Sequence, residues 1–275
     1  MEEYLGFKDL YLSEEELAAL YENPTQNTYD LMINEYLLVR DADGNLVDQF
    51  RWDGGEMQQV KQKTIKGKFV DTIKPRNPQQ ILALDMLYNP TITVKLLTGG
   101  YGVGKDALMM AAAMDMIERG RYDRLVYVRN NIEVRDSKPI GYLPGSGNEK
   151  LLPFAMPLVD KLGGMPALEM KLSEGEIELV HLGFMRGRDI KNAIIYVTEA
   201  ENMTKEHIQL LIGRVAEGSS LWINGDYKQT DAKVFEENNG IMRMIEKLKG
   251  NPLFGYVKLI KTERSATAAL ADLLD

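Results

Sequence analysis

The chain has 275 residues and 44% hydrophobic residues, enough for one large domain with a smaller appendage and a full core. It has no cysteine and two histidines, which excludes disulfides and thiolate metal sites and argues against histidine-rich ones. A net charge of -8 argues against coating nucleic acid with the whole surface, so any such contact must be local. With no apolar run of about 18 residues and no basic-then-apolar N-terminus, we expect a soluble cytoplasmic protein.

The first 72 residues predict a small β-containing appendage. Ser13 followed by three glutamates is typical of a helix N-cap and first turn. Two runs at residues 35–40 and 46–52 flank a turn-rich segment, which predicts a β-hairpin. The lysine-rich junction that follows fits either a solvated strand edge or phosphate contacts. We therefore expect an appendage over residues 1–72 and a larger domain over residues 73–275.

From residue 79 onward, short runs rich in β-branched residues alternate with helical patterns. This alternation is typical of βαβ units, so we expect an α/β fold with a mainly parallel sheet. The predicted strands cover residues 93–98, 124–129, 177–182, 193–198, 220–224 and 256–261. Thr204 is expected to cap a helix whose apolar residues face this sheet.

A glycine-rich motif between the first of these strands and the next helix gives the strongest functional signal. The motif is Gly99-Gly100-Tyr101-Gly102-Val103-Gly104-Lys105, which matches the phosphate-binding (Walker A) pattern G-x-x-x-x-G-K. Its glycines let backbone N–H groups point at phosphate oxygens, and Lys105 can reach the β- and γ-phosphates. A coincidental glycine-rich turn is the alternative. We expect this loop, with Asp106 and Ala107, to bind ATP.

Two positions depart from the usual pattern in a reciprocal way. The eighth loop position is normally Ser or Thr, whose hydroxyl binds Mg²⁺, but here it is Asp106. In the usual pattern, the strand predicted at 193–198 ends with Asp, and Glu follows it. In this sequence the two positions are Thr198 and Glu199. The two positions approach each other beside the metal in sites of this class. Asp106 and Thr198 therefore still provide one carboxylate and one hydroxyl there, with the two residue types exchanged between the positions. We expect both side chains to bind Mg²⁺ and Glu199 to activate water; decay into a non-hydrolysing site is the alternative.

Further polar residues are expected around the nucleotide. Gly225-Asp226 with Gln229 follows a predicted strand, as in motif III of superfamily 1 helicases. Gln229 is expected to contact the γ-phosphate or water while Asp226 fixes the loop, and a turn capped by Asp is the alternative. Asn77 and Gln80 are expected at the adenine, with a polar helix start as the alternative for Gln80.

The arginine that stabilises transition-state charge stays open at this point. The catalytic candidates are Arg188, Arg214 and Arg264, with Arg186 as a further possibility. Arg129, at the end of a predicted strand, is a candidate for contacting nucleic acid or supporting the site. Each of these arginines, taken alone, is more often a surface residue.

Together these residues resemble the PhoH-like family of P-loop ATPases over residues 34–274. The most specific matches beyond the loop are Arg76-Asn77, Gly141-Tyr142-Leu143-Pro144-Gly145, Glu149-Lys150 with Pro153, Arg186-Gly187-Arg188, Glu199-Ala200 with Asn202, and Gly225-Asp226 with Gln229. The chain departs from the family pattern at Asp106, at Thr198, and at Glu201 and Asn130-Asn131, where the family tends to have Gln and Pro.

The resemblance implies a RecA-like, helicase-like core that binds and hydrolyses ATP with Mg²⁺, forms a homo-oligomer such as a hexameric ring, and acts on RNA or single-stranded DNA. The hairpin before Arg76 is similar to the linker of longer members that carry a PIN domain, so we expect the ATPase part alone. A catalytically weak, nucleotide-binding oligomeric scaffold or regulator is the rival function. A small-molecule kinase is less favoured, because it would leave the motif III segment and residues 130–164 without a role.

Overall fold

The computed structural model describes residues 3–67, 72–129, 152–227 and 233–263. Within them, a six-stranded sheet with the order β10-β5-β9-β8-β6-β7 forms the centre of the molecule. Its strands are β5 (Val94–Thr98), β6 (Arg124–Arg129), β7 (Ile177–His181), β8 (Ala193–Val197), β9 (Ser220–Gly225) and β10 (Phe254–Lys258). All five pairings are parallel, which confirms the predicted α/β fold.

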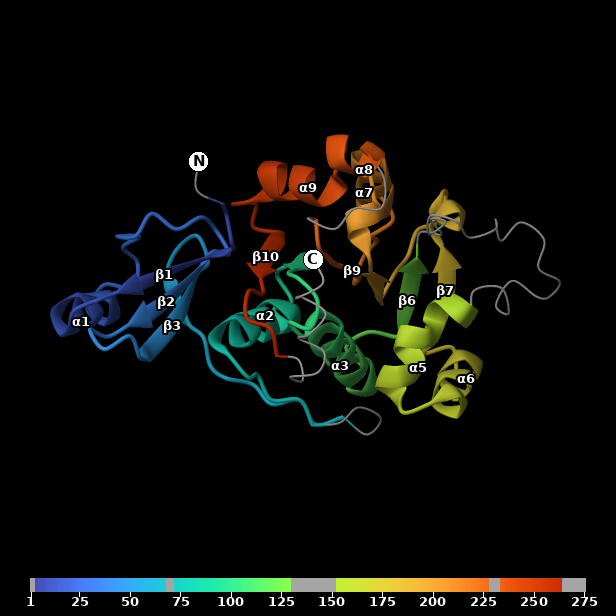
Figure 1. Cartoon of the computed structure of the whole chain (residues 1–275), viewed down its shortest axis with the longest axis horizontal. Helices are drawn as coiled ribbons and strands as arrows, with labels where there is room; N and C mark the ends of the chain where they lie inside the picture. The colour runs from blue at the N-terminus through green and yellow to red at the C-terminus, as the bar shows by residue number, and fades with distance from the viewer. Residues whose placement is uncertain (1–2, 68–71, 130–151, 228–232, 264–275) are drawn as a thin grey trace, which may run out of the picture.

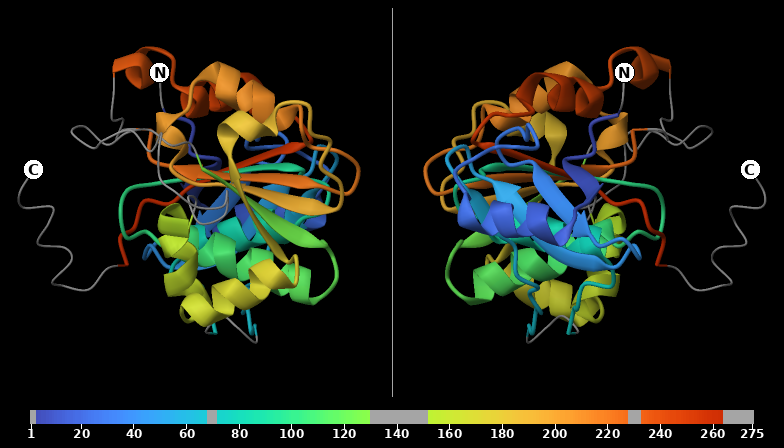
Figure 2. Two further views of the ribbon diagram at one scale, coloured as in Figure 1. Left: turned by 90° about the vertical axis from the view of Figure 1, so that its right-hand side faces the viewer. Right: turned by 90° about the vertical axis from the view of Figure 1, so that its left-hand side faces the viewer.

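Helices cover both faces of this sheet (Figure 2). One face carries α2 (Pro78–Tyr88), α3 (Lys105–Glu118), α5 (Met156–Leu162) and α6 (Met165–Ser173), and the other carries α7 (Lys205–Ile212) and α9 (Gly240–Leu248), with α8 (Lys233–Glu237) beside them. Short 3-10 turns are η2 (Leu152–Ala155), η3 (Leu182–Met185) and η4 (Ala200–Asn202). In the described part of the chain, no helix has the length and apolar character of a membrane span.

The central strands are apolar because helices cover them on both sides. Every residue of β8 and β9 is buried, as expected for parallel strands in the middle of a three-layer fold. Tyr196 and Trp222 face the cluster formed with α2 and α3, whereas Ile195 and Ile223 face α7 and α9. Since all strands run in one direction, the carboxyl ends of β5, β8 and β9 meet at one edge, where ligands bind in open α/β sheets.

A four-stranded sheet formed by the N-terminal residues lies beyond β10 (Figure 1). Its elements are β1 (Phe7–Tyr11), α1 (Glu14–Glu22), β2 (Tyr36–Arg40), β3 (Leu46–Trp52) and β4 (Met57–Gln59). β2 and β3 form the predicted antiparallel hairpin. Ser13 caps α1 and accepts a hydrogen bond from the Glu16 backbone N–H, also as predicted.

This N-terminal sheet is attached to the central domain by polar and apolar contacts. The Asn34 Nδ2 donates to the backbone oxygens of Pro252 (2.9 Å) and Phe254 (3.0 Å), at the start of β10. Tyr36 donates from its hydroxyl to Asp85 Oδ2 of α2 at 3.0 Å and lies in the same apolar cluster as α2. The appendage therefore shares the core of the larger domain, and the boundary after residue 72 stays a prediction.

A pair of glycine substitutions tests this attachment. Gly6 and Gly44 have similar positive φ angles of +82° and +85°, but a β-carbon on Gly6 would lie 1.9 Å from the Tyr256 carbonyl oxygen, whereas one on Gly44 meets nothing within 4 Å. Gly44→Ala should cost about 1 kcal/mol in the free energy of unfolding from backbone strain alone. Gly6→Ala should cost about 3 kcal/mol or more, because the sheet must also move away from β10. Urea unfolding measures both, and equal losses would contradict the attachment.

Candidate functional site

The glycine-rich loop connects the end of β5 to the first turn of α3. Gly99, Gly102 and Gly104 have φ angles of +146°, +71° and +92°. A β-carbon on Gly99 would lie 2.3 Å from the Leu259 carbonyl oxygen, so glycine is required there. The loop ends at the N-terminus of a 14-residue helix, whose unpaired N–H groups and dipole favour a bound anion. The loop conformation and the helix together form a site for phosphate.

The Lys105 side chain lies across this loop. Its Nζ donates to the carbonyl oxygens of Gly99 and of Gly100, at 2.8 Å for the latter. Burial lowers the pKa of the Lys105 ammonium, while the carboxylates of Asp106, Asp226 and Glu201 oppose this change. The amine is thus held by two weak backbone acceptors that a phosphate can replace.

A cavity of about 680 Å³ opens beside the loop. It lies between residues 72–76, the loop, α3 and Glu263, and its lining includes Gln80 and Ala107. This volume is in the range of sites that hold small ligands. The cavity is therefore large enough for the base and sugar of a nucleotide, and it opens directly beside the loop.

Gln80 and Asn77 tie the start of α2 to the loop. The Gln80 Oε1 accepts from the Arg76 N–H at 2.8 Å, and its Nε2 donates to the Val103 oxygen at 3.1 Å. Asn77 caps α2 and donates to Glu263 Oε1 at 2.8 Å. These bonds fix the Gln80 amide beside the loop and leave one N–H and one lone pair for contact with adenine, which stays a prediction.

Asp106 lies at the centre of a hydrogen-bond cluster between α3 and two strands. Its Oδ1 accepts from Asn224 Nδ2 at 2.8 Å, from the Tyr196 hydroxyl at 3.2 Å and from Thr198 Oγ1 at 3.5 Å. The structure thus brings together the two residues that depart from the usual pattern. One carboxylate and one hydroxyl fit Mg²⁺, which takes one or two protein oxygens and completes its shell with phosphate and water.

The sequence did not predict Asn224 and Tyr196 as site residues. β9 lies between β5 and β8, and Asn224 pairs with Leu97 of β5 in register, so its side chain reaches Asp106 from the middle of the three strands. Burial, with Asp106 nearby, raises the pKa of Tyr196 well above its usual value, so its hydroxyl stays a donor. The available signal was a polar residue at the buried end of an apolar strand, directly before Gly225.

Glu199 and Glu201 lie on the turn after β8. Glu199 has a left-handed backbone conformation with φ +55° and forms an ion pair with Arg129 at the end of β6, with 2.5 Å between Oε1 and the guanidinium. Glu201 accepts from the Asp226 backbone N–H at 3.0 Å. The carboxylates of Asp106, Glu199 and Glu201 therefore each accept from a donor of their own. No group of three or more His, Cys, Asp or Glu side chains placed to hold a metal ion occurs among the described residues.

The structure does not bring Arg188 or Arg214 to the loop of their own chain, so a role for either arginine in stabilising transition-state charge stays a prediction. Arg188 pairs with Glu178 near the start of β7, at 2.8 Å, and three strands separate β7 from β5. Arg214 follows α7, which runs back toward the opposite edge of the sheet, and its oxygen accepts from the Ile190 N–H before β8. Gln229 and Arg264 lie outside the described residues, as do residues 130–151 with their family motifs.

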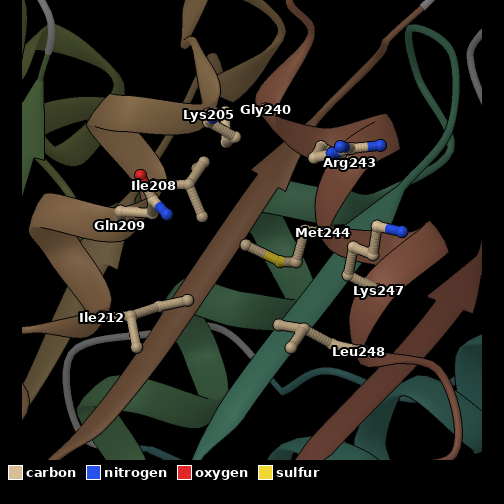
Figure 3. Close-up of a pocket in the computed structure, with 9 residues that line it drawn as sticks. All are labelled: Lys205, Ile208, Gln209, Ile212, Gly240, Arg243, Met244, Lys247 and Leu248. Carbon is tan, nitrogen blue, oxygen red and sulfur yellow. The ribbon is translucent and has the colours of Figure 1, made fainter.

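A second cavity, of about 310 Å³, lies between α7 and α9 (Figure 3). Its apolar lining comes from Ile208, Ile212, Met244 and Leu248, and the side chains of Arg243 and Lys247 extend from α9 beside it. No residue predicted for the nucleotide site lines this cavity.

Removal of the Asn224 amide tests the cluster around Asp106. Asn224→Ala should lower the free energy of unfolding by about 2 kcal/mol, because a buried bond to a carboxylate is lost. Asn238→Ala is the matched control, since Asn238 also donates to a carboxylate at 2.8 Å, that of Glu206, but at an exposed position. Urea unfolding should show a much smaller loss for the control. Similar losses of unfolding free energy for the two variants would contradict this, because the buried hydrogen bond to Asp106 would then stabilise the protein no more than an exposed one.

Comparison with known proteins agrees with this geometry. A family model described as PhoH-like protein matches residues 72–270. Protein PhoH2 of Bacillus subtilis (strain 168) is 34% identical over 290 residues, covering 99% of this chain and 65% of that protein. Protein PhoH2 of Thermobispora bispora is 28% identical over 274 residues, covering 97% and 62%. A PhoH-like protein of Mycobacterium leprae is 34% identical over 163 residues, covering 58% and 46%.

The chain therefore spans less than two thirds of the length of each of these relatives. The family match covers most of the chain and contains the glycine-rich loop, the Asp106 cluster and the central parallel sheet. The chain belongs to the PhoH-like family and is a P-loop nucleotide-binding protein.

Proposed function

We propose that the chain is a Mg²⁺-dependent ATPase that acts on RNA or single-stranded DNA in a helicase-like manner. The observation that carries this proposal is the contact of 3.5 Å between Thr198 Oγ1 and Asp106 Oδ1 beside the loop. A site decaying from an ancestral ATPase has no reason to keep a carboxylate and a hydroxyl in contact after both positions have changed. The pairing supports retained metal binding and, with it, hydrolysis.

Asp106 and Thr198 are the residues that would hold Mg²⁺. When bound, the ion would neutralise phosphate charge and polarise the γ-phosphate. Asp106 is the first residue after the loop lysine, so its carboxylate faces the phosphates at close range and repels them in the absence of a cation. Nucleotide binding should therefore depend on Mg²⁺ more strongly than at a site with a Ser or Thr at this position.

Glu199 is the proposed general base, directly after Thr198 in sequence. Its side chain is about half exposed, and its carboxylate is held by Arg129, which is mostly buried at the end of β6. An ion pair of this kind fixes the direction of the carboxylate, which is needed to orient and deprotonate an attacking water. Arg129 is thus a positioning residue for Glu199.

The placement of the arginines supports an oligomeric assembly. Arg188 and Arg214 lie away from the loop of their own chain, so either could reach a nucleotide only in a neighbouring subunit. Transition-state charge in such sites is often stabilised by an arginine supplied in trans. This placement is compatible with the homo-oligomer, such as a hexameric ring with nucleotides at its subunit interfaces, that the family resemblance implies.

A double substitution tests the exchanged metal ligands. Asp106→Thr alone should lower the ATPase rate roughly 100-fold, because two hydroxyls replace a carboxylate and a hydroxyl at the metal. Adding Thr198→Asp should bring the rate back to within roughly tenfold of the wild type. Phosphate release measures each rate, and Asp160→Thr, on the exposed face of α5, controls for loss of a carboxylate elsewhere. Independent, additive losses from the two changes would contradict the exchange.

One assay tests both the proposed general base, Glu199, and the proposed nucleic-acid partner. Turnover should rise when RNA or single-stranded DNA is added, and Glu199→Gln should abolish turnover while nucleotide binding persists, because the amide cannot accept the proton. A phosphate-release assay, with binding of a fluorescent nucleotide measured in parallel, separates these effects. Tight binding without turnover in the wild type would instead support the nucleotide-binding scaffold or regulator.

A further inference from the structure

A second carboxylate, Glu201, lies at the nucleotide site and has no part in the proposed hydrolysis. It belongs to the turn η4 after β8. Its Oε2 accepts a hydrogen bond from the Asp226 backbone N–H at 3.0 Å. The Asp226 carboxylate lies next to the loop, with Oδ2 3.8 Å from the place of a β-carbon on Gly100. Glu201 is therefore connected to the phosphate loop through a single residue, Asp226.

Close packing holds the Glu201 side chain in this position. A β-carbon on the buried Gly225 would lie 2.6 Å from Glu201 Oε2 and 2.8 Å from Ile241 Cδ1 of α9. The glycine thus makes room for the carboxylate between β9 and α9. The carboxylate therefore lies against the end of β9, and it remains partly exposed.

The polar groups that face Glu201 come from three segments. The loop contributes the Lys105 ammonium, the turn contributes the Glu199 carboxylate, and Asp226 after β9 contributes its backbone N–H. α9 presents the apolar Ile241, whereas its charged residues are exposed; they are Arg243, Glu246 and Lys247. Burial raises the pKa of Glu201 to about 7, and Glu199 adds to this rise while Lys105 opposes it. Near neutral pH, the carboxyl group is therefore partly protonated.

We propose that Glu201 takes up one proton from solvent when the nucleotide binds and releases it when the nucleotide leaves. The inference rests on the proposed ATP site in the loop. Bound phosphates bring negative charge toward Glu201 and engage the Lys105 ammonium that otherwise favours the carboxylate, so both effects favour the protonated form. The proton forms an O–H on Oε1, and Oε2 continues to accept from the Asp226 N–H.

Protonation makes Glu201 chemically similar to Gln. A neutral carboxyl group offers one donor and one acceptor, whereas a carboxylate offers acceptors only. The nucleotide complex is thus expected to contain the hydrogen-bonding pattern that Gln supplies permanently, at the cost of a bound proton. Because the complex holds more protons than the free protein, raising the pH through about 7 should weaken nucleotide binding.

Isothermal titration calorimetry in two buffers of different ionisation enthalpy measures this proton directly. Wild-type protein with Mg²⁺ and a non-hydrolysable ATP analogue at pH 7.5 should take up roughly half a proton per nucleotide, and affinity should fall roughly fivefold from pH 6 to pH 8.5. Glu201→Gln should remove the uptake and most of the pH dependence. Glu206→Gln should match the wild type, since hydrogen bonds lower the pKa of this exposed residue to about 2.

Equal proton uptake in the wild type and Glu201→Gln, or none in the wild type, would overturn the proposal. If Glu201→Gln fails to bind nucleotide, the ¹³C NMR titration of the wild-type Glu201 carboxyl group decides: its midpoint must rise when the analogue is added, and an unchanged midpoint overturns the proposal. Because the analogue is not hydrolysed, absence of ATPase turnover would contradict the proposed function alone and leave this result intact.

Discussion

The hydrogen bonds that converge on the Asp106 carboxylate are the constraint on which the candidate site depends. Asn224 donates from the end of β9 and Thr198 from the end of β8, while Asp106 itself begins α3. These bonds hold the N-terminus of α3 against β8 and β9. Because the glycine-rich loop connects β5 to α3, its position is fixed by the same bonds. The parallel sheet order, with β9 between β5 and β8, makes the arrangement possible.

The negative charge around the loop is the reason that we expect nucleotide binding at this site to need cations. Asp106, Glu199, Glu201 and Asp226 bring carboxylates to the loop region, and the first three each accept from a donor of their own. Lys105 is the cation within the loop itself. A nucleotide adds further negative charge, so binding must be accompanied by positive charge. Mg²⁺ beside Asp106 and a proton on Glu201 are two ways to supply it.

The sequence predicted the strands, the loop and the Asp106–Thr198 pair well, because apolar runs and glycine spacing are local signals. It missed the Asn224 and Tyr196 bonds, since these depend on the register between neighbouring strands. It left the choice of arginine open, and the structure adds that the direction of a helix and the number of intervening strands take Arg188 and Arg214 away from the loop of their own chain. Asp226 is expected from the sequence to fix the loop that carries Gln229, and the structure adds that its backbone N–H bonds to Glu201, for which Gly225 leaves room.

The exchange of metal ligands is the central claim, and a crystal structure with Mg²⁺ and a non-hydrolysable ATP analogue tests it most directly. The account predicts a metal ion within about 2.1 Å of an Asp106 carboxylate oxygen, with Thr198 bound to the ion or to one of its waters. A metal ion held by phosphate and water alone, with Asp106 still bonded to Asn224 and turned away from it, would contradict the account.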